Sequence, residues 1–144
     1  MEEIVKYCMT FLGEIFTAVH LRAEDDWLYH LSQCHSDKKE HGKEILESYR
    51  RRMREVIPSG EKVYLATYLG KKENQCNYIL DLLKEEFNCV TNIPWRKKYN
   101  VVDGREVDAL IDSLICRRAR IFIGTPGSTF SKYTGDLVEK TFYV

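Results

Sequence analysis

The chain has 144 residues, 44% hydrophobic and 31% charged, which suits one domain with a buried core and is too short for two domains of ordinary size. Its 22 basic residues equal its 22 acidic ones, so it lacks the basic surplus that nucleic-acid-binding proteins usually carry. It contains no run of about 18 apolar residues, and no membrane span is predicted.

The helices and strands are predicted from the period of the apolar residues and from Gly, Pro and Ser at the boundaries. In chain order they are a helix over 1–12 ended by Gly13, a strand over 16–21, a short helix over 27–34, a long charged helix over 37–56, a strand over 63–67, a helix over 74–87, a strand over 89–93, a loop over 94–104, a helix over 107–119, a strand over 120–124 and a last helix capped by Ser128. This alternation predicts an α/β fold with an open parallel sheet of about four strands and helices on both faces.

Right-handed crossovers between these strands predict the strand order 3-2-1-4. In such sheets the ligand site lies beyond the carboxyl ends of the strands, where the strand order reverses. Here that point falls between the first and fourth strands. The two loops that meet there are His20–Asp26 and Gly124–Phe130.

These two loops carry the components of a diphosphate site. Gly124 and Gly127 allow the backbone to approach a ligand, and Ser128 and Thr129 offer hydroxyls at the start of a helix, whose free N–H groups favour anions. Arg22, in the facing loop, could grip a diphosphate with two hydrogen bonds and no metal ion. A simple turn and helix cap explains the second loop about equally well.

Other nucleotide-binding motifs are missing from the sequence, and the role of one carboxylate, that of Asp112, is ambiguous. The sequence has neither G-x-x-x-x-G-K-[ST] nor G-x-G-x-x-G, which argues against ATP hydrolysis and NAD binding. Asp112 lies on the helix before the fourth strand, where a solvated carboxylate is the commoner case. It also lies among inward-facing residues, where it could accept hydrogen bonds from guanine N1–H and N2–H.

Three segments resemble, in the same order, motifs of the GDP-fucose protein O-fucosyltransferase family. Val19–Arg22 resembles its H-x-R motif, and Val63–Thr67 resembles the second strand of its donor domain. Asp112–Ser131 is similar to its block D-x-x-I-C-x-x-A-x-x-F-I-G-T-x-x-S-T-F-S. The resemblance implies two Rossmann-like domains in the GT-B arrangement, and residues 1–144 would form one of them, the C-terminal domain that binds most of the donor.

The resemblance also implies a role for each matched residue. Arg22 would bind the β-phosphate of GDP-fucose and stabilise the GDP leaving group, which makes it the predicted catalytic residue. The other predicted donor-binding residues are His20 for the nucleoside, Asp112 for guanine, and Ser128, Thr129 and Phe130 for the diphosphate. The family inverts the anomeric centre through an oxocarbenium-like state and needs no metal or other cofactor.

The sequence departs from the family pattern in two places. The N-terminal half is missing from these residues; in the family it supplies further donor contacts, most of the acceptor groove and, where one is used, the catalytic carboxylate base. We therefore expect a shortened piece of a longer enzyme, one subunit that needs a partner chain or a homo-oligomer, or a remnant that binds without turnover. Glu24, Asp25 and Asp26 are available carboxylates, although a solvated loop or a helix cap is their simpler role. Tyr68-Leu69-Gly70 stands where the family has acidic residues.

Three further expectations concern metals, nucleic acids and location. His30, Cys34, His35 and His41 could hold a metal, although their spacing fits no standard zinc pattern. Arg50–Arg54 is a dense basic run that could bind nucleic acid, or could be a solvated helix face paired with Glu47 and Glu55. Scattered cysteines favour free thiols, and the start Met1-Glu2-Glu3 predicts a cytoplasmic protein; a removed leader would instead imply the secretory pathway.

Overall fold

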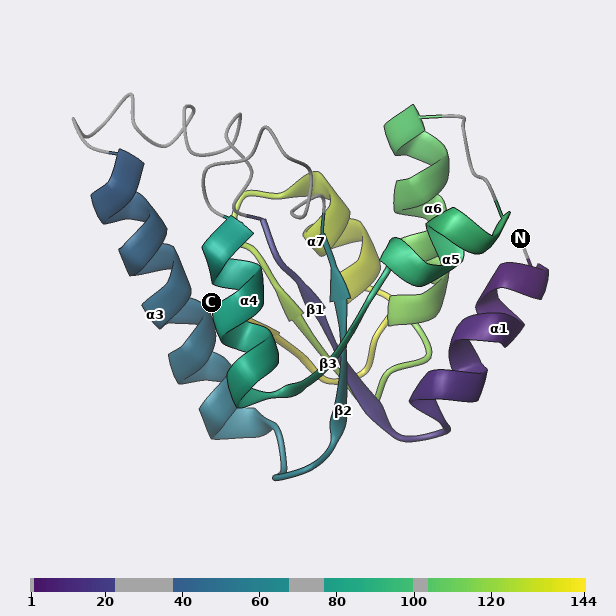
Figure 1. Cartoon of the computed structure of the whole chain (residues 1–144), viewed down its shortest axis with the longest axis horizontal. Coiled ribbons are helices and arrows are strands. Elements are labelled where there is room, and N and C mark those ends of the chain that lie inside the picture. The colour runs from purple at the N-terminus through teal and green to yellow at the C-terminus, as the bar shows by residue number, and fades with distance from the viewer. Residues whose placement is uncertain (1, 23–37, 68–76, 100–103) are drawn as a thin grey trace.

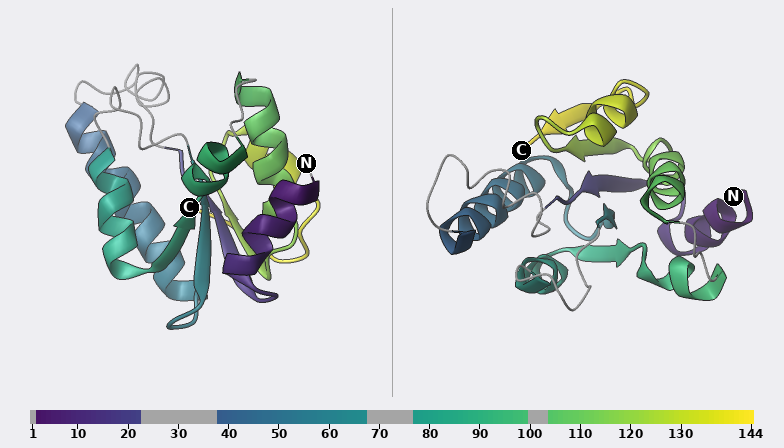
Figure 2. Two further views of the ribbon diagram at one scale, coloured as in Figure 1. Left: turned by 45° about the vertical axis from the view of Figure 1, so that its right-hand side comes forward. Right: turned by 90° about the horizontal axis from the view of Figure 1, so that it is seen from above.

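The computed structural model describes residues 2–22, 38–67, 77–99 and 104–144. They form an α/β fold in which one sheet of five parallel strands, ordered β3-β2-β1-β4-β5, is covered by helices on both faces (Figures 1 and 2). The predicted fold class is confirmed, and so is the order 3-2-1-4 of the first four strands. The fifth strand extends the sheet beyond the predicted four.

The observed boundaries lie close to those predicted. The strands are β1 (Phe16–His20), β2 (Lys62–Ala66), β3 (Asn88–Thr91), β4 (Ile121–Gly124) and β5 (Thr141–Tyr143). The helices are α1 (Glu2–Leu12), α3 (Lys38–Val56), α4 (Asn77–Glu86), α5 (Ile93–Tyr99), α6 (Gly104–Cys116) and α7 (Thr129–Gly135). None of the described helices is long and apolar enough to cross a membrane.

The sheet is buried because both of its faces carry apolar residues. Along β1, Ala18 belongs to the core that α1, α5 and α6 cover, whereas Val19 belongs to the core that α3 and α4 cover. Both faces of β1 are therefore apolar, as is typical of parallel strands with helices on each side. The right-hand view of Figure 2 shows the two helical layers on opposite sides of the strands.

The predicted loop over 94–104 is wrong for its first half, which forms α5. Pro94 lies in the first turn of this helix, where the missing N–H of proline costs no hydrogen bond. Trp95 is 1% exposed, and its indole N–H donates to the hydroxyl of Tyr64 over 2.9 Å. Burial of this large ring stabilises a helix that is too short to show a periodic pattern.

The fifth strand follows a turn after α7 and pairs with β4 in parallel, with Gly124 opposite Tyr143. Only three residues long, it offers too few positions for an alternating pattern. The short predicted helix over 27–34, the acidic residues 24–26 and Tyr68–Gly70 lie outside the described residues.

Candidate functional site

The predicted site lies where β1 and β4 end side by side. Val19 pairs with Ile123 in parallel register, so His20 and Gly124 end neighbouring strands at the same edge of the sheet. The chain leaves β1 toward Arg22 and leaves β4 toward Ser128, with the strand order reversing around this pair of strands. The topology therefore brings together two loops that are about 100 residues apart in sequence.

Two glycines shape the second loop. A Cβ at Gly124 would lie 3.0 Å from both the Ser131 Cβ and the Tyr143 ring, so no larger residue fits without displacing α7 or β5. Gly127 has φ of 80°, a backbone conformation that side chains with a Cβ rarely adopt. Together they turn the chain sharply from β4 into α7 and hold the start of α7 against the end of β4.

His20 connects the two loops directly. Its Nδ1 lies 2.7 Å from the Ser131 Oγ and 3.5 Å from the Ser128 Oγ. The Ser131 Oγ in turn accepts the Thr125 N–H over 2.8 Å. The His20 ring also packs against Phe130, with ring centroids 4.5 Å apart. His20, Ser128 and Phe130, which were predicted as site residues, thus form one cluster.

The fold keeps His20 uncharged. Its side chain is 7% exposed, and burial, with a smaller contribution from the nearby Arg22 charge, lowers the pKa of His20 to about 3. A neutral imidazole with this pKa is a poor proton acceptor near pH 7. The chemistry available to His20 is therefore hydrogen bonding and ring contact rather than proton abstraction.

Ser128 is the N-cap of α7, as predicted: its Oγ accepts the Ser131 N–H over 3.3 Å. Its carbonyl accepts the Lys132 N–H over 3.0 Å. The N–H groups of Thr129 and Phe130 precede the first intrahelical bond, so they have no acceptor within α7. Because α7 has only seven residues, an anion bound at this position would be held by these individual donors and not by a helix dipole.

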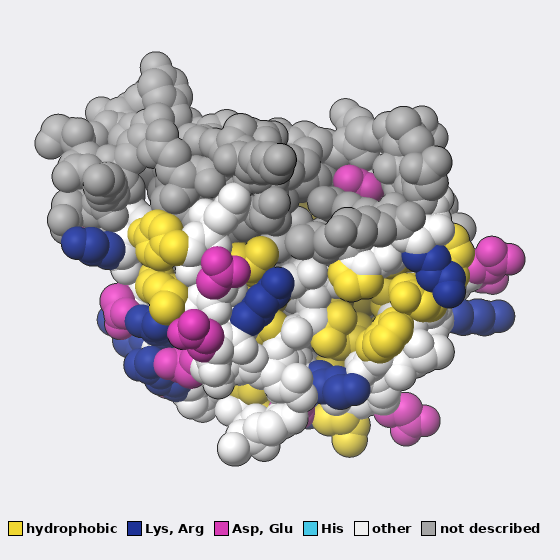
Figure 3. Space-filling view, in the orientation of Figure 1, with side chains coloured by type: hydrophobic (Ala, Val, Ile, Leu, Met, Phe, Trp, Pro, Cys, Tyr) yellow, Lys and Arg dark blue, Asp and Glu magenta, His cyan; other side chains and the backbone are white. Residues whose placement is uncertain are grey.

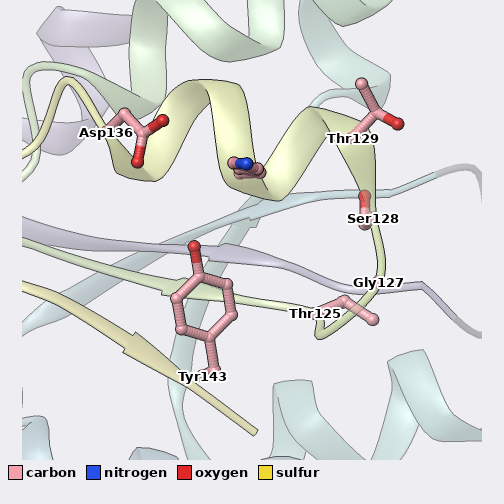
Figure 4. A pocket seen from close by; sticks show the side chains of 7 residues that line it. Thr125, Gly127, Ser128, Thr129, Asp136 and Tyr143 are labelled. Carbon is pink, nitrogen blue, oxygen red and sulfur yellow. The ribbon is translucent and has the colours of Figure 1, made fainter.

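A pocket of about 480 Å³ opens along α7, within the size range of small-ligand sites. Figure 4 shows Thr125, Ser128 and Thr129 at one end and Asp136 at the other, with Tyr143 below the helix. The lining residues are Thr125, Gly127, Ser128, Thr129, Lys132, Asp136 and Tyr143. The predicted phosphate-binding residues Ser128 and Thr129 thus line an open cavity.

Arg22 lies two residues beyond β1 and is half-buried. Its backbone N–H donates to the hydroxyl of Tyr49 over 3.1 Å. The same hydroxyl donates to the His20 carbonyl over 2.6 Å and lies 2.5 Å from the Thr125 Oγ1. The loop that carries Arg22 is therefore bonded to α3 as well as to the sheet.

Asp112 belongs to a second polar network. It is 3% exposed, and its carboxylate accepts the Tyr64 hydroxyl over 2.5 Å and the Asn92 side-chain N–H over 3.0 Å. Asn92 also donates to the Thr67 carbonyl over 2.9 Å. The described contacts of Asp112 thus connect α6 to β2 and to the start of α5.

Sequence reasoning did not assign to the site several residues that build or line it: Tyr49, Thr125, Ser131, Lys132, Asp136 and Tyr143. Tyr49 occupied an inward position of a charged helix, and the helical period indicates burial without indicating where a hydroxyl points. Thr125 lay within the recognised block and was interpreted only as part of a turn. Tyr143 lies on the strand that was not predicted.

The structure bears differently on the two alternative sites, a metal site and a nucleic-acid-binding basic run. No group of three or more potential metal ligands occurs within the described part of the chain, while His30, Cys34 and His35 lie outside it and so does the side chain of His41. In the basic run, Arg50 pairs with Glu47, Arg52 with Glu55 and Arg54 with Glu86. Figure 3 accordingly shows charges of both signs interspersed over α3 and α4, which favours the interpretation as a solvated helix face.

The sequence model of the family described as GDP-fucose protein O-fucosyltransferase matches residues 2–136. The chain belongs to this family. O-fucosyltransferase 36 of Arabidopsis thaliana is 26% identical over 138 residues, an alignment that covers 88% of this chain and 24% of that protein. The chain thus spans about a quarter of the length of the curated relative it matches.

Solved fucosyltransferases share the fold. A crystal structure of NodZ α-1,6-fucosyltransferase soaked with GDP-fucose matches with a TM-score of 0.58 and 19% identity, over 98% of this chain and 44% of NodZ. POFUT1 in complex with GDP-fucose matches with a TM-score of 0.56 and 19% identity, over 99% of this chain and 45% of POFUT1. This O-fucosyltransferase-family chain therefore corresponds in fold to somewhat less than half of each enzyme.

Proposed function

We propose that this chain binds GDP-fucose at the joined ends of β1 and β4 and supplies the donor half of a fucosyl-transfer site. The observation that carries the proposal is the hydrogen bond between His20 Nδ1 and Ser131 Oγ, 2.7 Å long and spanning 111 positions. It joins the two family motifs into one site next to an open pocket. The family match over residues 2–136 supports the choice of ligand.

In this proposal the diphosphate is bound without a metal ion. The Arg22 guanidinium binds the β-phosphate, and the N–H groups of Thr129 and Phe130 donate to the remaining phosphate oxygens. Ser128 and Thr129, whose hydroxyls can donate hydrogen bonds, line the same end of the pocket. Asp112, whose carboxylate accepts hydrogen bonds from Tyr64 and Asn92, is assigned to the guanine edge because it occupies the matching position of the family motif.

The proposed reaction is a direct displacement that inverts the anomeric carbon. An acceptor hydroxyl attacks C1 of fucose, the bond from C1 to the β-phosphate oxygen breaks, and its electron pair leaves with GDP. Arg22 stabilises the charge that develops on that oxygen. The proton of the acceptor hydroxyl requires a base, and we assign His20 to positioning because its pKa of about 3 suits it poorly to that task.

The direct test is calorimetric titration of the purified chain with GDP, using ADP and UDP as controls and repeating each titration with a chelator. We expect GDP to bind selectively and the chelator to leave its affinity unchanged. No GDP binding by a chain shown to be folded would contradict the proposal. GDP binding lost on chelation would contradict its metal-free part.

Replacing Arg22 should remove the charged contact to the β-phosphate. We expect Arg22→Ala to weaken GDP binding by about 1.5–3 kcal/mol, the usual effect of losing a hydrogen bond to a charged group. Arg51→Ala is the matched control, since Arg51 is exposed on α3 and should leave the affinity unchanged. Equal effects of the two changes in the same titration would show that Arg22 is misassigned.

A second candidate is a subunit that binds nucleotide sugar without transferring it. It is favoured by the pKa of about 3 of His20, because this side chain lies in the site and is a poor base for the acceptor hydroxyl. Release of GDP from GDP-fucose, measured with and without glycan or peptide acceptors, separates the two candidates. Acceptor-dependent release supports transfer by this chain or its homo-oligomer, whereas tight binding without release supports the subunit and a separate partner chain.

A further inference from the structure

We propose that Tyr49 is a positioning residue of the donor site, whose buried hydroxyl fixes the loop that carries Arg22. This inference rests on the proposed function, because it concerns the same phosphate-binding loop. Tyr49 lies on α3, outside the motifs that the family resemblance carried, and no role in the site was predicted for it. The inference follows from where its hydroxyl makes its bonds.

The Tyr49 hydroxyl lies at the junction of the two site loops. It donates to the His20 carbonyl over 2.6 Å and accepts the Arg22 N–H over 3.1 Å. It also lies 2.5 Å from the Thr125 Oγ1, which itself contacts the His20 carbonyl over 3.0 Å. A phenol has one proton and two lone pairs, so these three contacts use its full hydrogen-bonding capacity.

The ring of Tyr49 packs in the core, whereas its hydroxyl makes hydrogen bonds to the site loops. The ring is 1% exposed and packs in the core with Leu46 and Met53 of the same helix, a place that a phenylalanine would fill equally well. The hydroxyl adds nothing to that apolar packing. Among the described residues, its hydrogen bonds to residues 20, 22 and 125 reach both loops of the proposed site.

The bond to Arg22 continues the sheet beyond its last ladder hydrogen bond. Leu21 N–H donates to the Ala66 carbonyl over 3.0 Å, which is a bond of the ordinary β1–β2 type. The next donor along the chain, the Arg22 N–H, is held by Tyr49 instead. The backbone of Arg22 is thus fixed where the sheet ends, and a misplacement of about 1 Å in a positioning group can markedly reduce rates.

The test compares Tyr49→Phe with Tyr64→Phe, which removes an equally buried hydroxyl from the Asp112 network on the other face of the sheet. The first readout is hydrogen exchange of the Arg22 amide, followed by NMR without any ligand. The second is the affinity for GDP relative to guanosine, which has no phosphate. Circular dichroism melting checks that each variant is folded.

We expect Tyr49→Phe to speed exchange of the Arg22 amide and to weaken GDP binding by about tenfold, the upper range for one net hydrogen bond. Guanosine binding should change little, whereas a general loosening of the fold would weaken both ligands alike. Tyr64→Phe should leave exchange of the Arg22 amide as it is in the wild type.

Two results would overturn the inference: an Arg22 amide in Tyr49→Phe that exchanges as in the wild type, or a GDP-to-guanosine affinity ratio that does not change. A wild-type chain that binds no GDP would instead overturn the proposed function. Faster exchange of the Arg22 amide in Tyr49→Phe would even then show that the hydroxyl holds this loop.

Discussion

His20 illustrates how burial changes the chemistry of one residue. At the protein surface a histidine titrates close to neutral pH, and its role would be ambiguous between base and hydrogen-bond partner. Here burial first, and the Arg22 charge second, lower the pKa of His20 to about 3. The consequence is a neutral ring held between Ser131 and Phe130 over the whole physiological range.

This shift predicts a pH dependence of stability. The folded pKa lies below the ordinary value of 6.5, so the unfolded chain binds the extra proton first as the pH falls. The contribution of His20 to the free energy of unfolding is therefore complete above about pH 6.5 and is lost between there and pH 3. We expect a loss of about 1–2 kcal/mol between pH 7 and pH 5.5.

Denaturant unfolding of wild type and His20→Gln between pH 7 and pH 5.5 isolates the contribution of His20 to the free energy of unfolding, because the other histidines are common to both proteins. The variant should lose stability less steeply below pH 6.5. Parallel curves for the two proteins would contradict a buried, neutral His20.

At the scale of elements, an ion pair joins the amino-terminal ends of the three central strands. Arg120, just before β4, donates to both carboxylate oxygens of Glu61, just before β2, each over 2.9 Å. Thr17 of β1 donates to the same carboxylate over 2.5 Å. This group lies at the edge of the sheet opposite the proposed site, so we assign it to stability rather than to ligand binding.

Removing the Glu61 charge should therefore cost stability without affecting GDP affinity. We expect Glu61→Gln to lower the free energy of unfolding by about 1–2 kcal/mol, reduced from the range for charged hydrogen bonds because Arg120 is partly exposed. Burial alone would raise the pKa of Glu61, but the bonds from Arg120 and Thr17 and the Arg120 charge lower it below its ordinary value of 4.5.

A carboxylate with a lowered folded pKa stabilises the protein above about pH 4.5, and this stabilisation is lost as the pH falls through the folded pKa. This pH window overlaps that of His20 below pH 4.5, but His20 is common to wild type and Glu61→Gln, so its effect cancels in the difference between the two proteins. Denaturant curves at pH 7 and below pH 4.5 should show the gap between wild type and Glu61→Gln narrowing in acid. A difference in the free energy of unfolding between wild type and Glu61→Gln that does not change with pH would rule out the ion pair as the cause of that difference.

At the scale of the whole molecule, two apolar cores lie on opposite faces of one sheet. Leu83 of α4 is fully buried in the first and Ile115 of α6 in the second. Because β1 contributes residues to both cores, the faces should unfold together. Cooperative unfolding is also the usual behaviour of a single domain of this size.

We therefore expect Leu83→Ala and Ile115→Ala each to lower the free energy of unfolding by about 2–5 kcal/mol while unfolding remains a single transition. Leu110→Ala is the control, since Leu110 is 42% exposed on α6 and should change stability by less than about 0.5 kcal/mol. Far-UV circular dichroism and tryptophan fluorescence, followed together in denaturant, make the measurement. Transitions at different denaturant concentrations would contradict a single cooperative domain.

The sequence by itself determined the elements that are long enough to show a periodic apolar pattern and the motifs that lie in one stretch of chain. The long helix before β2, the strand order 3-2-1-4, the Ser128 cap and the family followed from local patterns, because apolar period and turn residues act over a few positions. Short elements such as α5 and β5 were missed, because segments of three to seven residues are too short to show a periodic pattern. Contacts with distant residues stabilise them instead.

Only the tertiary structure decided how the candidate site is assembled. The bond between His20 and Ser131, the low pKa of His20 and the three contacts of the Tyr49 hydroxyl join residues far apart in the chain. Asp112 is another case, since its sequence position indicated an inward side chain but not its bonds to Tyr64 and Asn92. Hydrogen-bond direction and burial depend on which elements meet in space, and the hydrophobic pattern of one element does not contain that information.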